Sequence, residues 1–282
     1  MVTRGKLFLV GGKDGRNDDR VLIDRFVRIC GGAAARVLVI TSASETPERH
    51  LEEYTRAFQE SGVREVTVVH AEERAASEGS ALLSLLDRVD GVYFSGGGQR
   101  RLLGAMGSTR FDDRLRKRHR QGLHVGGTSA GASAMSSVMI AGDGRDPVQQ
   151  SPVELSTGFG LLPEVIVDQH FQQRERLSRL IAAVVRNPSL LGFGLDEGTA
   201  VEIDALGCGR VFGKGALTVV DGSRLRGSSP PDSNEPDRPA AFTGMRLHVL
   251  TEGWGYDLAT RKAKSPVKPR RSGARSRARA MK

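Results

Sequence analysis

The chain has 282 residues, 38% of them hydrophobic and 27% charged, with 42 Lys and Arg, 33 Asp and Glu, and two cysteines. This length and apolar content suit one large or two small globular domains and exclude a collagen-like or mainly disordered chain. No apolar run approaches the ~18 residues of a membrane-spanning helix, and no signal-peptide pattern is present, so we expect no membrane contact. Cys30 and Cys208 cannot form a disulfide framework, which favours a cytoplasmic protein.

The net charge of +9 is concentrated at the end of the chain. Residues 261–282 carry ten of the basic residues and no acid, so residues 1–260 hold 32 basic and 33 acidic residues, a net charge of −1. A segment so charged and so poor in large apolar side chains is predicted to be a disordered tail. Binding of this tail to nucleic acid or another polyanion is one hypothesis, and a solubilising extension is the other.

Short apolar runs alternate with amphipathic stretches along residues 1–260. Strands are expected at Lys6–Val10, Arg36–Thr41, Glu65–Val69, Gly91–Ser95 and Leu123–Gly126, and helices at Asp19–Cys30, Pro47–Ser61, Ser80–Val89 and Phe111–Gln121. This alternation predicts one α/β domain, a three-layer sandwich with a mostly parallel central sheet. Ligands then gather beyond the carboxyl ends of the strands.

The second half of the chain is less regular. A helix is expected over Arg174–Arg186, a surface loop over Gly227–Ala240, and strands near Ala200–Ile203, Arg210–Phe212, Leu217–Val220 and Leu247–Leu250.

The strand over Leu123–Gly126 runs into Gly127-Thr-Ser129-Ala-Gly131, the GxSxG pattern of a nucleophile elbow. Glycines on both sides of the serine allow a sharp turn that exposes the Ser129 hydroxyl, and the amide of Ala130 is placed to stabilise an oxyanion. The pattern therefore predicts Ser129 as a nucleophile.

A serine nucleophile needs a base, and the chain has six histidines. His170 follows an apolar, strand-like run in VIVDQHF and is the best candidate, and His70, which also ends a predicted strand, is an alternative. His50 and His119 are expected on solvated helical faces. A carboxylate should orient the imidazole; Asp146 is favoured over Asp143, with Glu154 and Asp168 as further possibilities.

These segments, together with GLLPEVIVDQHFQQRERLSRL and GFGLDEGTA, closely resemble the cyanophycinase family over Leu7 to Leu258. The resemblance implies a serine peptidase on a glutamine-amidotransferase-like α/β fold, distantly related to α-aspartyl dipeptidases. It implies exopeptidase cleavage of cyanophycin, a polyaspartate with arginine on its β-carboxyls, to β-aspartyl-arginine dipeptides. It also implies a homodimer with no metal and no organic cofactor.

The resemblance assigns Ser129 as the nucleophile and His170 as its base, and places the acidic residue in the loop of Asp146. Gly98, in the turn Ser95-Gly-Gly-Gly-Gln99, joins Ala130 in the oxyanion hole. The implied substrate contacts are Gln99, Asp168, Gln169, Arg174 and Arg179. A guanidinium binds a carboxylate with two hydrogen bonds, which suits the two arginines, and Asp196 or Glu197 is a candidate acceptor for the substrate guanidinium.

Three other functions are consistent with the pattern. A related dipeptidase acting on short aspartyl or β-aspartyl peptides would share the catalytic residues. An α/β-hydrolase esterase also uses GxSxG, but the chain has no HGGG-like loop. A catalytically inactive binding protein would act through its basic tail.

Overall fold

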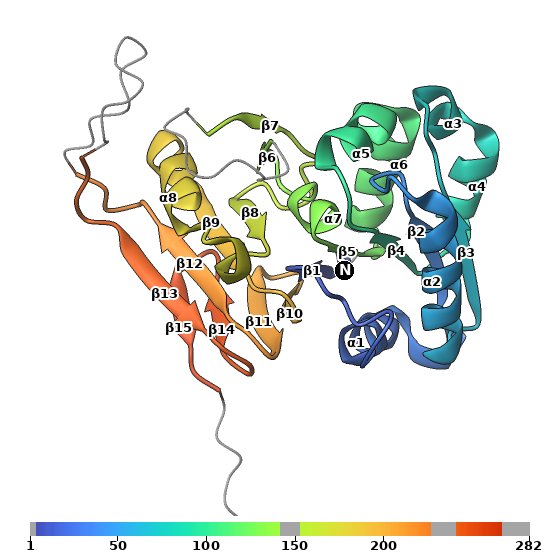
Figure 1. Cartoon of the computed structure of the whole chain (residues 1–282), viewed down its shortest axis with the longest axis horizontal. Helices are drawn as coiled ribbons and strands as arrows, with labels where there is room; N and C mark the ends of the chain where they lie inside the picture. The colour runs from blue at the N-terminus through green and yellow to red at the C-terminus, as the bar shows by residue number, and fades with distance from the viewer. Residues whose placement is uncertain (1–3, 142–152, 227–240, 267–282) are drawn as a thin grey trace, which may run out of the picture.

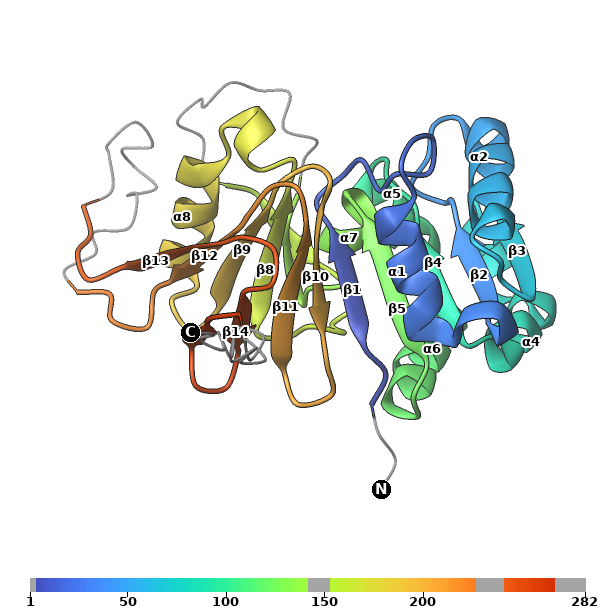
Figure 2. The same ribbon diagram turned by 90° about the horizontal axis from the view of Figure 1, so that it is seen from below.

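The computed structural model of the chain describes residues 4–141, 153–226 and 241–266. Five parallel strands form one side of a nine-stranded sheet (Figures 1 and 2). Their order in space is β1 (Leu7–Val10), β5 (His124–Thr128), β4 (Gly91–Phe94), β2 (Arg36–Ile40) and β3 (Glu65–Val69). Because all five run in one direction, their carboxyl ends share one edge of the sheet.

Helices cover both faces of these strands, as buried parallel strands require. The α1 helix (Val21–Cys30) and α2 (Pro47–Glu60) pack on one face, where Phe8 and Val10 of β1 join their core cluster. The other face, which receives Leu7 and Leu9 of β1, is covered by α3 (Arg74–Glu78), α4 (Ser80–Arg88), α5 (Gln99–Met106) and α6 (Arg110–Arg120). The predicted α/β class with a mostly parallel central sheet is confirmed.

Four antiparallel strands extend the sheet beyond β1. They are β10 (Thr199–Ile203), β11 (Cys208–Gly213), β14 (Gly255–Asp257) and β15 (Lys262–Lys264). The last strand begins inside the segment that the sequence predicts to be a disordered tail. That prediction is wrong for residues 261–264, because β15 pairs with β14 and Arg261 donates to the buried carboxylate of Asp221 at 2.7 Å. The rest of the tail, from residue 267, and the loop expected over Gly227–Ala240 lie outside the described residues.

A second sheet of four strands, which the sequence did not predict, lies beside the first. Its order is β13 (Arg246–Leu250), β12 (Leu217–Asp221), β9 (Leu191–Leu195) and β8 (Val165–Gln169). One face is covered by α8 (Leu177–Arg186), which lies at the opposite end of the molecule from α3 and α4 (Figure 1). The strands β8 and β9 are parallel, so their carboxyl ends also lie side by side.

Short elements complete the described fold. They are η1 (Gly32–Ala34), α7 (Ala130–Ser133), the β6 (Val138–Ile140) and β7 (Leu155–Thr157) pair, and η2 (Gln172–Arg174). The α7 helix contacts both β5 of the first sheet and β8 of the second, so these two strands lie on either side of the same short helix. His119 of α6 is buried, so the expectation that it is solvated is wrong; its ring bonds Arg4 and the carbonyl of Leu123.

Candidate active site

Ser129 stands between the end of β5 and the start of α7 in a strained backbone conformation. Its φ is 53° and its ψ is −116°, a combination that few non-glycine residues adopt. The flanking glycines are required by close packing: a Cβ on Gly127 would lie 2.8 Å from the backbone of Gly131, and one on Gly131 would lie 2.4 Å from the carbonyl oxygen of Phe94. The predicted sharp turn at Ser129 is therefore present in the structure.

His170 follows the last residue of β8 and reaches across to Ser129. Its Nε2 lies 2.8 Å from the Ser129 Oγ, a hydrogen-bonding distance that lets the ring accept the hydroxyl proton. The ring is only 15% exposed, and the His170 amide donates to the carbonyl of Gly11 at 2.7 Å. The sequence thus identified two residues, 41 positions apart, that the fold brings into contact.

The third member of this chain of hydrogen bonds is Glu197, where we had predicted Asp146. Glu197 Oε1 lies 2.8 Å from His170 Nδ1. Both Asp146 and Asp143 lie outside the described residues. Because Gln169 pairs with Leu195 in parallel β8 and β9, the residues just beyond these two strand ends become neighbours.

The sequence makes Asp196 or Glu197 a candidate acceptor for the substrate guanidinium, and in the structure both carboxylates have partners within the protein. Asp196 accepts backbone hydrogen bonds from Gln172 and Ala216, each at 3.0 Å, so it holds a turn together. The signal for Glu197 was available in the sequence, since LDEG ends an apolar run just as DQH does.

The charge states of the site suit proton transfer. Burial lowers the pKa of His170 and outweighs the effect of the hydrogen bond that its Nδ1–H donates to Glu197, which raises the pKa, so the ring is neutral at pH 7 and can accept a proton. Partial burial raises the pKa of Glu197. Hydrogen bonds from Lys13 and His170 lower it by more than burial raises it, so the net shift is downward. Glu197 is therefore an anion at pH 7, ready to stabilise an imidazolium.

Two backbone turns face the hydroxyl. Ala130 is the first residue of α7, and its amide has no acceptor among the described residues. The predicted partner, Gly98, donates its amide to the carbonyl of Ala43 at 2.8 Å, so this amide already has an acceptor within the protein. Gly96, two positions earlier, lies against Ser129: a Cβ there would be 3.4 Å from the Ser129 Cβ.

Comparison with known proteins is consistent with this arrangement. The family model for Peptidase family S51 matches residues 7–207. The chain belongs to peptidase family S51. It is 37% identical over 261 residues to a cyanophycinase of Trichormus variabilis, covering 92% of this chain and 87% of that protein. It is 34% identical over 260 residues to a cyanophycinase of Geminocystis herdmanii, covering 91% and 95% of the two chains.

Solved structures support the fold of this S51 peptidase. A crystal structure of a peptidase from an acI-B1 actinobacterium aligns with a TM-score of 0.64 at 19% identity, covering 94% of this chain and 98% of that one. A putative peptidase E of Listeria monocytogenes aligns with a TM-score of 0.53 at 19% identity, covering 75% and 98%. At this level of identity, both matches concern the fold alone.

The substrate-contact residues expected in this S51 peptidase fall into a buried cluster and a more exposed part. Asp168 is 1% exposed and accepts hydrogen bonds from Arg179, with Nε at 2.7 Å, and from Arg176 at 3.3 Å. Gln169 is also buried and bonds Arg176, a residue that the sequence pattern alone does not identify as part of the site. Its signal was a third arginine within the same RERLSR run.

The other two expected contacts lie outside this buried cluster. Arg174 is exposed, and its positive charge helps to lower the pKa of His170. Gln99, at the start of α5, is buried and donates to the carbonyl of Ile140 at 3.0 Å. Among the expected contacts, Arg174 is therefore the one whose charge acts on His170.

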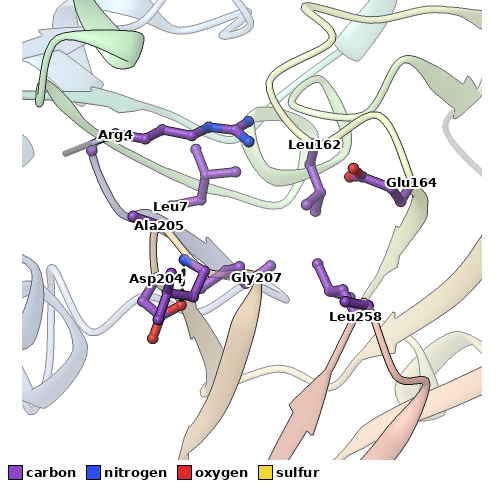
Figure 3. A pocket seen from close by; sticks show the side chains of 12 residues that line it. Arg4, Leu7, Leu162, Glu164, Asp204, Ala205, Gly207 and Leu258 are labelled. Atoms are coloured by element: carbon purple, nitrogen blue, oxygen red, sulfur yellow. Dashed lines mark hydrogen bonds between the residues drawn. The ribbon is translucent and has the colours of Figure 1, made fainter. Parts of the chain in front are cut away.

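The described residues contain no group of three or more His, Cys, Asp or Glu side chains able to hold a metal ion. A cavity of about 220 Å³, lined by Arg4, Leu162, Glu164 and Asp204 among others, lies at the amino ends of β1 and β8 (Figure 3). It is at the opposite edge of the strands from Ser129 and His170. Among the described residues, no helix is long and apolar enough to cross a membrane.

Proposed function

We propose that this S51 peptidase is a serine exopeptidase that hydrolyses cyanophycin to β-aspartyl-arginine dipeptides. The observation that carries the proposal is the continuous series of hydrogen bonds from Ser129 through His170 to Glu197, with both distances at 2.8 Å. The substrate follows from the similarity to curated cyanophycinases over most of the chain. In this proposal Glu197 takes the role that the sequence had given to Asp146.

The reaction begins with the attack of the Ser129 Oγ on the backbone carbonyl that precedes the terminal unit. His170 accepts the hydroxyl proton at Nε2, and the resulting imidazolium is stabilised by Glu197 at Nδ1. The tetrahedral intermediate carries its negative charge on the former carbonyl oxygen. The amide of Ala130 and the amides of the Gly96-Gly97 turn donate to that oxygen.

The intermediate collapses when the imidazolium gives its proton to the leaving amine, which breaks the peptide bond and leaves an ester on Ser129. A water molecule then loses a proton to His170 and attacks the ester; the bond between Oγ and the acyl carbon breaks, His170 returns the proton to Oγ, and the acid product leaves. Removing one oxyanion donor typically lowers the rate about 100- to 1000-fold, so the two backbone turns contribute nearly as much as the side chains.

Substrate recognition uses the positive charge near His170. The end of a cyanophycin chain presents carboxylates close to the scissile bond, and Arg174 is exposed and near enough to act on the His170 charge. Arg179 and Asp168 pair with each other, so we assign them, with Gln99 and Gln169, to shaping the binding surface. A homodimer and contact of the tail with polyanions remain predictions.

The test is hydrolysis of purified cyanophycin followed by mass spectrometry of the products. We expect the wild-type protein to release β-aspartyl-arginine dipeptides, and Ser129→Ala to release none while it keeps the wild-type melting temperature. Aspartyl and β-aspartyl dipeptides are assayed in parallel. Turnover of these short peptides with no release from cyanophycin would identify the related dipeptidase activity instead.

A further inference from the structure

The loop that follows β1 contacts each part of the proposed triad except the nucleophile side chain. The carbonyl of Gly11 accepts from the His170 amide at 2.7 Å, and the carbonyl of Gly12 accepts from the Gly198 amide at 2.8 Å. A Cβ on Gly12 would lie 2.3 Å from the His170 Cε1, so the backbone of this loop packs against the imidazole ring. Lys13 is the next residue along the chain.

The ammonium of Lys13 bonds the carboxylate oxygen of Glu197 that His170 leaves unused. Lys13 Nζ lies 2.6 Å from Oε2, while His170 Nδ1 lies 2.8 Å from Oε1. The Lys13 side chain is 73% exposed and that of Glu197 is 19% exposed. Each oxygen of the carboxylate therefore has its own donor, which fixes the plane of the carboxylate.

Lys13 occupies a backbone conformation that a lysine adopts at a cost. Its φ is 48°, in the left-handed region where glycine and asparagine are the common residues. Strained residues of this kind concentrate at functional sites, where the surrounding structure holds the backbone in an unfavourable conformation. The backbone thus gives a reason to look for a function of the Lys13 ammonium.

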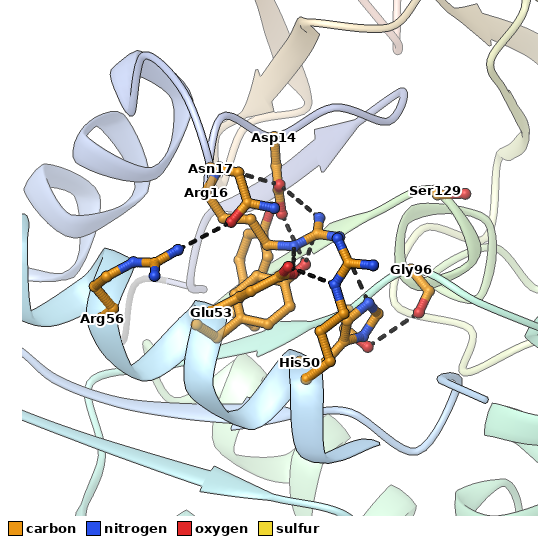
Figure 4. A network of polar contacts seen from close by, with 12 residues as sticks. Asp14, Arg16, Asn17, His50, Glu53, Arg56, Gly96 and Ser129 are labelled. Carbon is orange, nitrogen blue, oxygen red and sulfur yellow. Dashed lines mark hydrogen bonds and ion pairs between the residues drawn. The ribbon is translucent and has the colours of Figure 1, made fainter. Parts of the chain in front are cut away.

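The following residue, Asp14, anchors the loop in the core (Figure 4). Its side chain is buried and accepts hydrogen bonds from the hydroxyls of Tyr54 at 2.8 Å and Tyr93 at 3.2 Å. Arg16 adds an ion pair at 3.0 Å and also bonds Glu53. A fully buried carboxylate with three donors cannot shift easily, so the point from which Lys13 extends is fixed.

We propose that Lys13 is a positioning residue of the triad, whose ammonium holds Glu197 in the plane and charge state that His170 requires. The proposal rests on the proposed function, because it assigns Lys13 a role through Glu197. The positive charge of Lys13 partly offsets the negative charge of the Glu197 carboxylate, which limits how far Glu197 raises the proton affinity of His170. Without the ammonium, the imidazole would hold its proton more strongly and would be a free base over a narrower pH range.

Other charges around the triad remain unchanged when Lys13 is replaced. Arg174 and Arg176 act on His170 from the segment after β8, and Asp18 acts on Lys13 from its own loop. An ion pair of similar form, between Lys214 and Asp19 at 2.7 Å, is exposed and includes no member of the triad. Lys214 is therefore a matched control for the loss of one exposed lysine.

The experiment measures the pKa of His170 by NMR titration of its imidazole resonance in the full-length protein, with His170→Asn used for assignment. In Lys13→Met we expect the pKa of His170 to rise by about half a unit, since one positive charge nearby is lost. Lys13→Arg should restore the wild-type value, and Lys214→Met should leave it unchanged. Lys13→Asn suits the left-handed backbone, so it should show the same shift at an undiminished melting temperature.

Kinetics on cyanophycin provide a second measurement. Lys13→Met should lower kcat about tenfold with KM nearly unchanged, and the acidic limb of the profile of kcat/KM against pH should move to higher pH. An unchanged His170 pKa in Lys13→Met and Lys13→Asn would overturn the proposal, and so would a shift of the same size in Lys214→Met. If the wild-type protein fails to hydrolyse cyanophycin, the proposed function is refuted, and the NMR titration still decides the role of Lys13.

Discussion

Replacement of Glu197 by glutamine tests which carboxylate serves His170. Glutamine keeps the size of the side chain, but it presents either a neutral oxygen or an amide NH2 group to Nδ1. If the NH2 group faces Nδ1, the ring proton moves to Nε2, and the ring can no longer accept the proton of Ser129. If the oxygen faces Nδ1, the imidazolium loses the negative charge that stabilises it.

The size of the effect follows from the position of Glu197. The corresponding change of a buried triad carboxylate to its amide lowers kcat about 10⁴-fold in serine proteases. Glu197 is 19% exposed, so water replaces part of its effect, and we expect a loss of about 10³-fold, or about 4 kcal/mol of transition-state stabilisation. The hydrogen bond of 2.8 Å between Oε1 and Nδ1 is the interaction removed.

The assay is the initial rate of dipeptide release from cyanophycin at pH 7 to 8, with melting temperatures measured alongside. Asp146→Asn and Asp143→Asn are the matched controls, and we expect each to stay within about threefold of the wild type. A Glu197→Gln variant of near wild-type rate, combined with an inactive Asp146→Asn variant, would refute the assignment of Glu197 and restore the residue that the sequence favoured.

Three further outcomes are expected. Gly12→Ala should lower kcat about 100-fold, because its Cβ would displace the His170 ring; Gly31→Ala, at a similar φ of 116° but with nothing within 4 Å, should keep full activity. As the pH is lowered, kcat/KM should fall with a midpoint below pH 6.5, because burial lowers the pKa of His170 and the neutral ring is the active form. A midpoint well above 6.5 would contradict this. Arg261→Ala should destabilise the protein by about 1 to 3 kcal/mol in denaturant unfolding, since Asp221 is buried, whereas truncation after residue 266 should not; equal stability of all three proteins would contradict the ion pair.

Local patterns predicted the parts of the structure that depend on local sequence. The five parallel strands are short runs of apolar, β-branched or small residues, and all five were placed within one or two residues. Ser129 was found because a turn with glycines on both sides is written in consecutive residues. His170 was found because an apolar strand ends in a polar cluster, which marks a strand end whatever the strand order.

Relations between distant segments were not predictable in the same way. The choice of Glu197 depends on β9 lying parallel to β8 in a second sheet, and neither strand order nor register is written in either segment. The oxyanion turn shows the same limit at a finer scale. Three consecutive glycines look alike in the sequence, and only the hydrogen bond from Gly98 to Ala43 separates Gly98 from Gly96. The boundary of the basic tail was misplaced because β15 gains its order from β14 and Asp221, not from its own composition.

The most direct test of the central claim is the detection of a covalent intermediate on Ser129. The enzyme is mixed with cyanophycin, quenched in acid within milliseconds to seconds, digested and examined by mass spectrometry. We predict an acyl adduct on the peptide that contains Ser129, which is enriched early in the reaction and absent from Ser129→Ala. Dipeptide release by Ser129→Ala at the wild-type rate, with no adduct on the wild-type protein, would contradict nucleophilic catalysis by this serine.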